Sequence, residues 1–261
     1  MDDIFFETGN ADVFPVSYLL PNLDEVVDES KFVMYVNSKK VGSVGNFICI
    51  TGKPKARKSV FAYAILSSAI TRMEQLGIGI RLPDDRQDIV LVDTEQDRND
   101  ILLGMQRLKR QTKLPSLAHI KNLFVYSVSI LEPALIIAFM TNLFKKNSHI
   151  GIVVIDGLLD LINDMNDIKE SRKLMQHLKI WAIENQCLIV TILHQSKSAN
   201  FSIGHLGSFA DRKAQAVLQV EKSKDEEQSI LSAQYMRSDR NFDEVVIEYD
   251  VFSQCYQQIN K

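Results

Sequence analysis

Apolar runs of strand length alternate with amphipathic segments of helix length through most of this chain. The runs expected to form strands are 47–51, 89–93, 123–128, 150–155 and 188–193. Between them, apolar residues recur near helical spacing in four segments, 58–75, 97–113, 131–145 and 168–186. This alternation predicts an α/β fold: a doubly wound, mostly parallel sheet with helices on both of its faces.

Strands are also expected near the C-terminus, but no helices separate them. They are 217–222, 229–236 and 244–249. Within the last of them, Val245, Ile247 and Tyr249 occupy alternate positions, which suits a strand near the edge of an antiparallel sheet. We therefore expect antiparallel strands to be added at the C-terminal edge of the parallel sheet.

The N-terminal part of the chain is less regular. Residues 1–45 show no single hydrophobic period, although Leu19–Val36 contains many apolar residues. We divide the chain into a lead-in or arm, 1–45, and a main domain, 46–261. The lead-in either packs one helix or strand on the main domain or docks on a neighbouring subunit.

The composition is that of an ordinary globular protein, with 46% of the 261 residues hydrophobic and 24% charged. A net charge of -3 gives no overall basic field, so any nucleic-acid contact would depend on a local patch. The widely spaced Cys49, Cys187 and Cys255 indicate reduced thiols. The acidic start and the lack of an apolar run of about 18 residues predict a cytoplasmic protein without a membrane partner.

The segment 46–59, NFICITGKPKARKS, leads from an apolar strand into a basic loop. It fits the phosphate-binding pattern G-x-x-x-x-G-K-[ST] at Gly52 and at Lys58-Ser59, but Arg57 replaces the second glycine. In such a loop, backbone N–H groups and the N-terminus of the following helix bind phosphate. The residues expected to contact a nucleotide are Gly52, Lys53, Pro54, Lys55, Ala56, Arg57, Lys58, Ser59 and Val60.

Other predicted strands also end in polar or ionisable residues. Glu95 follows the second strand, Asp156 follows the fourth, and His194 and Gln195 follow the fifth. Ligands of doubly wound sheets bind beyond the carboxyl ends of the strands, so these residues are expected beside the phosphate loop.

Each of these residues has a chemical role in a nucleotide site. Lys58 would reach the terminal phosphates, and Ser59 and Asp156 would hold Mg2+. Glu95 would orient or deprotonate the attacking water. Taken singly, an aspartate after a strand is more often a turn or helix-cap residue, and Glu95 would be a solvated loop acid.

This order of motifs resembles that of the RecA-like ATPases, and most closely the DnaB/RepA-type hexameric replicative helicases of mobile elements and plasmids. The resemblance makes Glu95 the catalytic base and His194 or Gln195 the γ-phosphate sensor, followed by the basic residue Lys197. It also makes 46–261 a RecA-like ATPase domain. ATP and Mg2+ are then the ligands, and DNA replication or mobilisation is the expected role.

The same resemblance implies a homo-oligomer such as a hexameric ring. The family places a basic finger that reaches the neighbour's site in the segment Met236-Arg237-Ser238-Asp239-Arg240-Asn241, where Arg240 fits best and Arg237 next. Such a finger stabilises charge on the transferring phosphoryl group. The alternative is a solvated pair of arginines at a strand end.

The loop 196–208 is a candidate DNA contact, because it lies where RecA-like proteins contact DNA. It offers Lys197, Phe201 and His205, which is one charge and one stacking ring. A loop without a DNA role is the alternative. The acidic stretch 156–167 would repel a phosphate backbone, which counts against a simple helicase function.

Arg57 leaves two outcomes open. The basic loop still binds triphosphate, with Arg57 touching phosphate or a neighbouring subunit, or the site binds weakly and hydrolyses little. If the residue has a positive φ, arginine is costly there, and its side chain must point away or lie along the nucleotide. The candidate functions are therefore a DNA-acting ATPase, a nucleotide-dependent switch with little hydrolysis, and a small-molecule kinase, for which no arginine-rich lid is evident.

Overall fold

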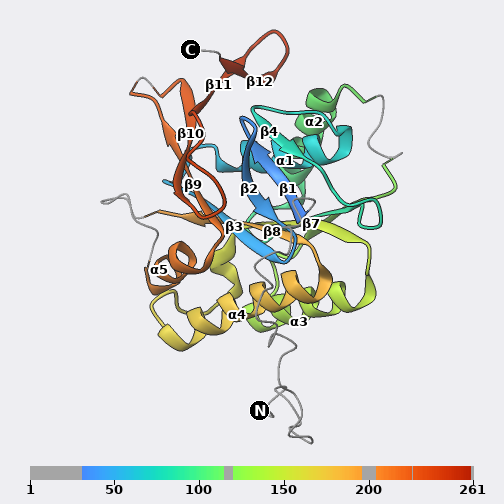
Figure 1. Ribbon diagram of the computed structural model, residues 1–261, viewed down its shortest axis with the longest axis vertical. Helices are drawn as coiled ribbons and strands as arrows, with labels where there is room; N and C mark the ends of the chain where they lie inside the picture. Colours follow the sequence, from blue (N-terminus) through green and yellow to red (C-terminus); the bar gives the residue numbers. More distant parts are fainter. Residues whose placement is uncertain (1–30, 115–119, 196–203, 225, 260–261) are drawn as a thin grey trace, which may run out of the picture.

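The structure is a computed structural model that describes residues 31–114, 120–195, 204–224 and 226–259 (Figure 1). Its strands are β1 (Phe32–Val36), β2 (Lys39–Ser43), β3 (Asn46–Gly52), β4 (Ile78–Ile80), β5 (Asp88–Asp93), β6 (Leu123–Ser127), β7 (Ile150–Asp156), β8 (Leu188–His194), β9 (Ala216–Lys222), β10 (Gln228–Met236), β11 (Val245–Asp250) and β12 (Cys255–Ile259). Its helices are α1 (Lys58–Thr71), α2 (Arg98–Thr112), α3 (Pro133–Lys146), α4 (Ile168–Asn185) and α5 (Gly204–Lys213), together with the 3-10 helix η3 (Leu158–Leu161).

The main sheet has the strand order β12-β11-β10-β9-β3-β8-β7-β5-β6. The strands from β9 to β6 pair in parallel. The pairs β9–β10, β10–β11 and β11–β12 are antiparallel. The predicted mostly parallel sheet with antiparallel strands at its C-terminal edge is therefore confirmed.

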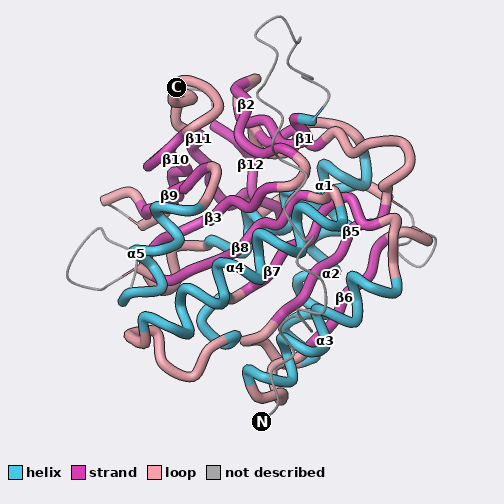
Figure 2. Tube along the Cα trace, turned by 60° about the horizontal axis from the view of Figure 1, so that its bottom comes forward, coloured by secondary structure: helices cyan, strands magenta, loops and turns pink. Residues whose placement is uncertain are grey.

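Helices cover both faces of this sheet, as predicted (Figure 1). One buried core forms between the sheet and α1, and includes Phe61, Ile65 and Leu108 of α2. A second core forms on the other face against α3, α4 and α5, and includes Met140 and Trp181. Figure 2 shows β3, β8, β7 and β5 of this sheet running side by side across the molecule. Because both faces are covered, the central strands are continuous apolar runs.

The described part of the N-terminal lead-in forms the hairpin β1–β2, which pairs with β4 in a separate three-stranded antiparallel sheet. Its two-residue turn places Asn37 at φ 43° and Ser38 at φ 64°, the positive values that tight hairpin turns require. Met34 and Val41 join the core beneath α1. The predicted docking of an arm on a neighbouring subunit stays a prediction.

Several boundaries differ from the prediction. The first helix ends at Thr71 rather than Gln75, because Arg72 adopts a left-handed cap conformation with φ 57°. The predicted loop 196–208 is partly helical, since α5 begins at Gly204 and buries Leu206 and Ala210 one turn apart. The strands β4 and β12 were not predicted. Among the described residues, no helix is long and apolar enough to cross a membrane.

Candidate functional site

The polar ends of four strands meet at one edge of the sheet. The strands β3, β8, β7 and β5 are consecutive neighbours. In their register, Gly52 pairs with His194 and Asp93 pairs with Asp156. The structure therefore brings together the phosphate loop and the predicted residues Asp156 and His194, and Glu95 follows Asp93 by two positions.

The phosphate loop runs from the end of β3 to the start of α1. A Cβ atom on Gly52 would stand 2.4 Å from the carbonyl oxygen of Val220, so only glycine allows β9 to approach this closely. Lys53, Pro54 and Lys55 are exposed. Arg57 is the N-cap residue of α1, but its side chain makes no capping hydrogen bond. The first turn of α1 contains no acidic residue. An uncapped, positively polarised helix N-terminus beside basic side chains fits a phosphate group.

Lys58 lies inside this loop, with only 5% of its surface exposed. Its ammonium group donates to the carbonyl oxygens of Gly52 at 3.0 Å and Lys53 at 3.1 Å. It also lies 3.0 Å from Nδ1 of His194. Burial lowers the pKa of Lys58, although the nearby carboxylates of Asp156 and Glu95 oppose this effect. The lysine is thus held at the centre of the loop.

Ser59 and Asp156 are joined directly. Ser59 Oγ donates a hydrogen bond of 2.8 Å to Asp156 Oδ2. Burial raises the pKa of Asp156 to about 6, and the Ser59 bond partly opposes the shift. No group of three or more His, Cys, Asp or Glu side chains in the described part of the chain could hold a metal ion. A hydroxyl and one carboxylate instead fit Mg2+, which keeps several sites for water and phosphate oxygens.

His194 links Lys58 to Glu95. A lysine ammonium has only hydrogens to donate, so Nδ1 of His194 must accept, and its Nε2 carries the proton. That Nε2 lies 3.3 Å from Glu95 Oε1. This bond from His194 is the main reason that the pKa of Glu95 is lowered, with burial acting in the opposite direction. Glu95 is therefore ionised and fixed in orientation.

Glu95 has further support that the sequence-based site did not include. The Asp93 carboxylate accepts from the backbone N–H groups of Glu95 at 3.1 Å and Gln96 at 2.7 Å. Thr94 Oγ1 accepts from Gly157 N at 2.9 Å and lies 2.6 Å from Asp160 Oδ2. These residues join the segments that follow β5 and β7. The signal that could have identified these residues from the sequence is that they lie close to Glu95 and Asp156 along the chain.

Arg57 has φ 71°, the left-handed conformation in which the pattern's glycine is favoured. Its side chain points away from the loop. The guanidinium donates to the carbonyl oxygens of Glu227 at 2.7 Å and Glu226 at 2.9 Å, and to Ser229 Oγ at 3.1 Å. It also lies 5.8 Å from the ring centroid of Tyr256. Its partners are therefore the β9–β10 turn, the start of β10 and β12.

Gln195 takes part in the sheet rather than in the polar cluster. It is 1% exposed, its backbone N–H donates to Gly52 O at 3.0 Å, and its Nε2 donates to Thr51 Oγ1 at 3.2 Å. Its Oε1 is buried without a hydrogen-bond partner among the described residues. Of the two sensor candidates, His194 is the one that contacts Lys58 and Glu95.

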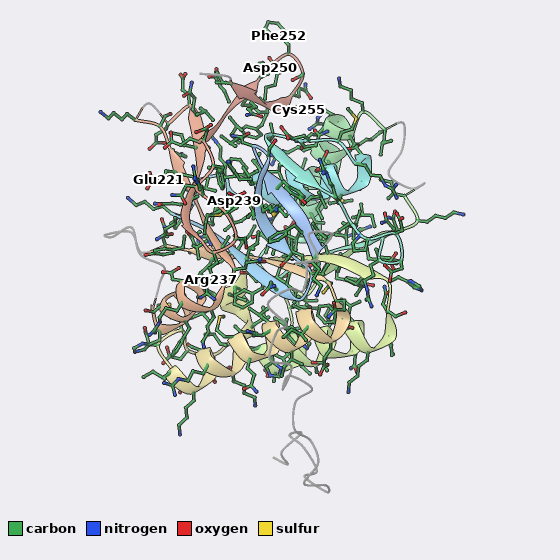
Figure 3. All side chains as sticks on the ribbon, viewed as in Figure 1. Glu221, Arg237, Asp239, Asp250, Phe252 and Cys255 are labelled. Atoms are coloured by element: carbon green, nitrogen blue, oxygen red, sulfur yellow. The ribbon has the colours of Figure 1, made fainter. Side chains whose placement is uncertain are left out.

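The two finger candidates lie away from the phosphate loop of the same chain. Met236 at the end of β10 pairs with Ala216 at the start of β9, and β9 runs parallel to β3. Arg237 and Arg240 therefore follow β10 at the opposite end of the sheet. Figure 3 shows Arg237 far from Cys255 of β12. Arg237 donates to the carbonyl of Arg212, and Arg240 is exposed.

The candidate DNA contact falls mostly outside the described residues. Lys197 and Phe201 are among the residues that are not described. His205 is exposed in the first turn of α5. Their role stays a prediction.

A cavity of about 230 Å³ opens beside Ser59. Its walls come from α1, from α2 and the residues before it, and from the β11–β12 hairpin. The lining side chains include Val60, Tyr63, Asp100, Arg107 and Tyr256. Aromatic rings together with a few polar groups are typical of a small-molecule site.

No protein-family model and no curated protein matches this sequence. Among solved structures, the crystal structure of the RadB recombinase is similar, with a TM-score of 0.59 and 13% sequence identity. The match covers 85% of this chain and 94% of that chain. At this identity the likeness concerns the fold. With its mixed, mostly parallel sheet and the phosphate loop at the carboxyl end of β3, the protein has a RecA-like α/β fold.

Proposed function

We propose that this protein is an ATPase that binds ATP with Mg2+ at the loop 52–59. One observation carries the proposal: the Ser59–Asp156 bond and the Lys58–His194–Glu95 chain form a single cluster at the end of β3. The cluster combines a buried cation for phosphate, a metal-binding pair and an oriented carboxylate base. Phosphoryl transfer needs these three parts.

The proposed reaction assigns a role to each side chain. Lys58 turns its ammonium from the loop carbonyls to the β- and γ-phosphates. Ser59 and Asp156 would hold Mg2+, which when bound would supply positive charge to the phosphate oxygens. Glu95 accepts a proton from water as the water oxygen bonds to the γ-phosphorus. The bond to the β–γ bridging oxygen breaks, and ADP and phosphate leave.

The cavity beside Ser59 is the proposed site of the nucleoside. It begins at the N-terminus of α1, beside Ser59, and both Tyr63 and Tyr256 line it. A purine would lie against an aromatic wall, and Asp100, Gln111 and Arg107 offer polar groups to the base or ribose.

The test is ATP binding and phosphate release by the full chain with Mg2+. We expect Lys58→Ala to lose ATP binding, and Glu95→Gln to bind ATP but turn over at least about 100-fold more slowly. Glu184→Gln, which changes an exposed glutamate on α4, is the matched control and should behave like the wild type. A wild type that binds no ATP, or a Glu95→Gln variant with full turnover, would contradict the proposal.

We further propose that the ATPase acts in DNA replication or mobilisation as a homo-oligomer of the DnaB/RepA-type helicase group. Arg240 supports this, because it is exposed at the end of the sheet opposite its own site, where a neighbour could receive it. Arg237 is exposed at the same end, although its side chain donates to the carbonyl of Arg212. DNA-stimulated turnover and a mass above the monomer with ATP and Mg2+ are the expected results. Their joint absence would reject this role and leave the ATPase itself standing.

A switch with little hydrolysis is the second candidate. Its support is the lowered pKa of Glu95, which makes this carboxylate a weaker base, and the arginine in the glycine position. Tight ATP binding with turnover that Glu95→Gln leaves unchanged would favour the switch. Turnover that falls in Glu95→Gln favours the enzyme.

A further inference from the structure

Arg57 departs from the phosphate-loop pattern, yet its side chain is one of the best-bonded in the site. We propose that Arg57 is a positioning residue that holds Tyr256 of β12 as a wall of the nucleoside cavity, and so sets how much the base adds to nucleotide affinity. This inference rests on the proposed function, because it concerns the same nucleotide. Arg57 would then affect recognition of the base through Tyr256, without contacting the base itself.

The contacts tie two consecutive loop residues to the C-terminal strands. Arg57 donates to the carbonyls of Glu226 and Glu227 and to Ser229 Oγ. Ser229 Oγ lies 3.3 Å from the carbonyl oxygen of Ala56 and is fully buried. A guanidinium that uses two nitrogens in this way is fixed in direction, which a lysine at the same place could not reproduce.

The fixed guanidinium faces the ring of Tyr256 at 5.8 Å. Tyr256 also packs edge-on against Tyr249, with 5.3 Å between ring centroids. Both tyrosines line the cavity, as do Arg57 and Ser59. Arg57, which belongs to the phosphate loop, therefore connects this loop to the tyrosines that line the cavity.

The wall needs such a tie because it belongs to the edge of the sheet. The strand β12 ends the sheet and pairs only with β11 among the described strands. The turn between them is open to solvent, with Phe252 99% exposed at its tip (Figure 3). As the outermost strand, β12 is held by the sheet on one side only, so contacts from outside the hairpin also contribute to the position of Tyr256.

The test compares ATP with inorganic tripolyphosphate, both with Mg2+, by equilibrium binding. Arg57→Gly should still fold, since glycine adopts φ 71° without strain. We expect it to bind ATP about tenfold more weakly, as the loss of a positioned aromatic contact suggests, and to bind tripolyphosphate within about twofold of the wild type. Arg57→Lys keeps the charge but not the fork, and should resemble Arg57→Gly.

Tyr256→Ala should reproduce the selective loss of ATP affinity. If Arg57 acts through Tyr256, the double variant should be no weaker than either single variant, because the two changes remove one interaction. Additive losses would show that Arg57 acts independently of Tyr256 and would overturn the inference.

Cys255 supplies a second measurement, because this residue lines the cavity and is partly exposed, while Cys49 and Cys187 are fully buried. In Arg57→Gly we expect Cys255 to be alkylated severalfold faster, with the other two thiols still protected. Labelling of all three thiols marks unfolding, and the comparison then relies on Arg57→Lys. A rate unchanged in both variants counts against the proposed tie.

The two proposals fail in different ways. If the wild type binds neither ATP nor tripolyphosphate, the ATPase proposal fails. Suppose instead that the wild type binds both ligands, and that Arg57→Gly either weakens both affinities equally or changes neither. The nucleotide site then stands, and the role of Arg57 as a positioning residue is rejected.

Discussion

Gly157 lies against the carboxylate of Glu95, so that a Cβ atom on Gly157 would stand 2.2 Å from Glu95 Oε1. Gly157 follows Asp156 directly, and its backbone N–H is bonded to Thr94 Oγ1. The proposed base is therefore held between His194 on one side and a bare backbone on the other. The absence of a side chain at position 157 leaves room for the Glu95 carboxylate, although no sequence pattern indicated this.

Gly157→Ala should displace the Glu95 side chain and slow turnover. Because the substitution acts on the base and not on the loop, we expect kcat to fall by about tenfold or more while the ATP dissociation constant stays nearly unchanged. Gly79→Ala is the matched control, since a Cβ there would meet Tyr35 Cβ at an ordinary 4.0 Å. A Gly157→Ala enzyme with wild-type kcat would show that Glu95 needs no such support.

His194→Ala should move the acid limb of the pH–rate profile to higher pH. The bond from His194 lowers the pKa of Glu95, and Glu95 must be ionised to act as a base. Without His194 its pKa rises toward the ordinary value, so kcat/KM falls at a higher pH than in the wild type. The measurement is kcat/KM from pH 4 to 8. The exposed His149, changed to alanine, should leave the profile in place.

Asp156→Asn should stabilise the protein in the absence of Mg2+. Burial raises the folded-state pKa of Asp156 to about 6. A raised pKa means that the folded state holds the proton more tightly than the unfolded chain, so stability is lost as the pH rises through about 6. The asparagine variant avoids this loss, which is about 3 kcal/mol above pH 6.

Urea unfolding in EDTA at pH 4 and pH 8 measures this difference. The gain should be largest at pH 8 and shrink toward pH 4, because both states are then closer to full protonation. Asp243→Asn, at an exposed position, should give no such pH-dependent gain. An Asp156→Asn protein less stable than the wild type at pH 8 would refute the assignment of burial as the cause.

Tyr63→Phe should raise the free energy of unfolding of the nucleotide-free protein by about 1 kcal/mol, because it removes a buried hydroxyl that has no hydrogen-bond partner among the described residues. Tyr35→Phe is the matched contrast. Its hydroxyl donates to the carbonyl of Phe32 at 3.2 Å, so its loss should be destabilising. Equal effects of the two changes in denaturant unfolding would contradict the prediction.

The central strands and the residues at their ends could be predicted from the sequence, because a strand covered on both faces is a continuous apolar run. Such a run in β7 places Asp156, and a second in β8 places His194. The parallel direction of these strands follows from the βα alternation, so their carboxyl ends lie at one edge of the sheet. This logic found Lys58, Ser59 and Glu95 as neighbours.

Local patterns could not predict contacts that depend on register or on distant parts of the chain. The bond between His194 and Lys58 depends on the pairing of β3 with β8. The hairpin β1–β2 has short strands of mixed polarity, and its partner β4 is distant in sequence. The helix α5 is short, with few apolar positions, so the sequence predicts its first half, 204–208, as part of a loop.

The ties of Arg57 to Glu227 and Glu226 span 170 and 169 positions of the chain. During synthesis, the strand, loop and first helix of the site are therefore made well before the segment that anchors Arg57. Contacts this distant in sequence slow the search for the native state. A ribosome-bound chain that stops before residue 226 would display the loop 52–59 without this anchor.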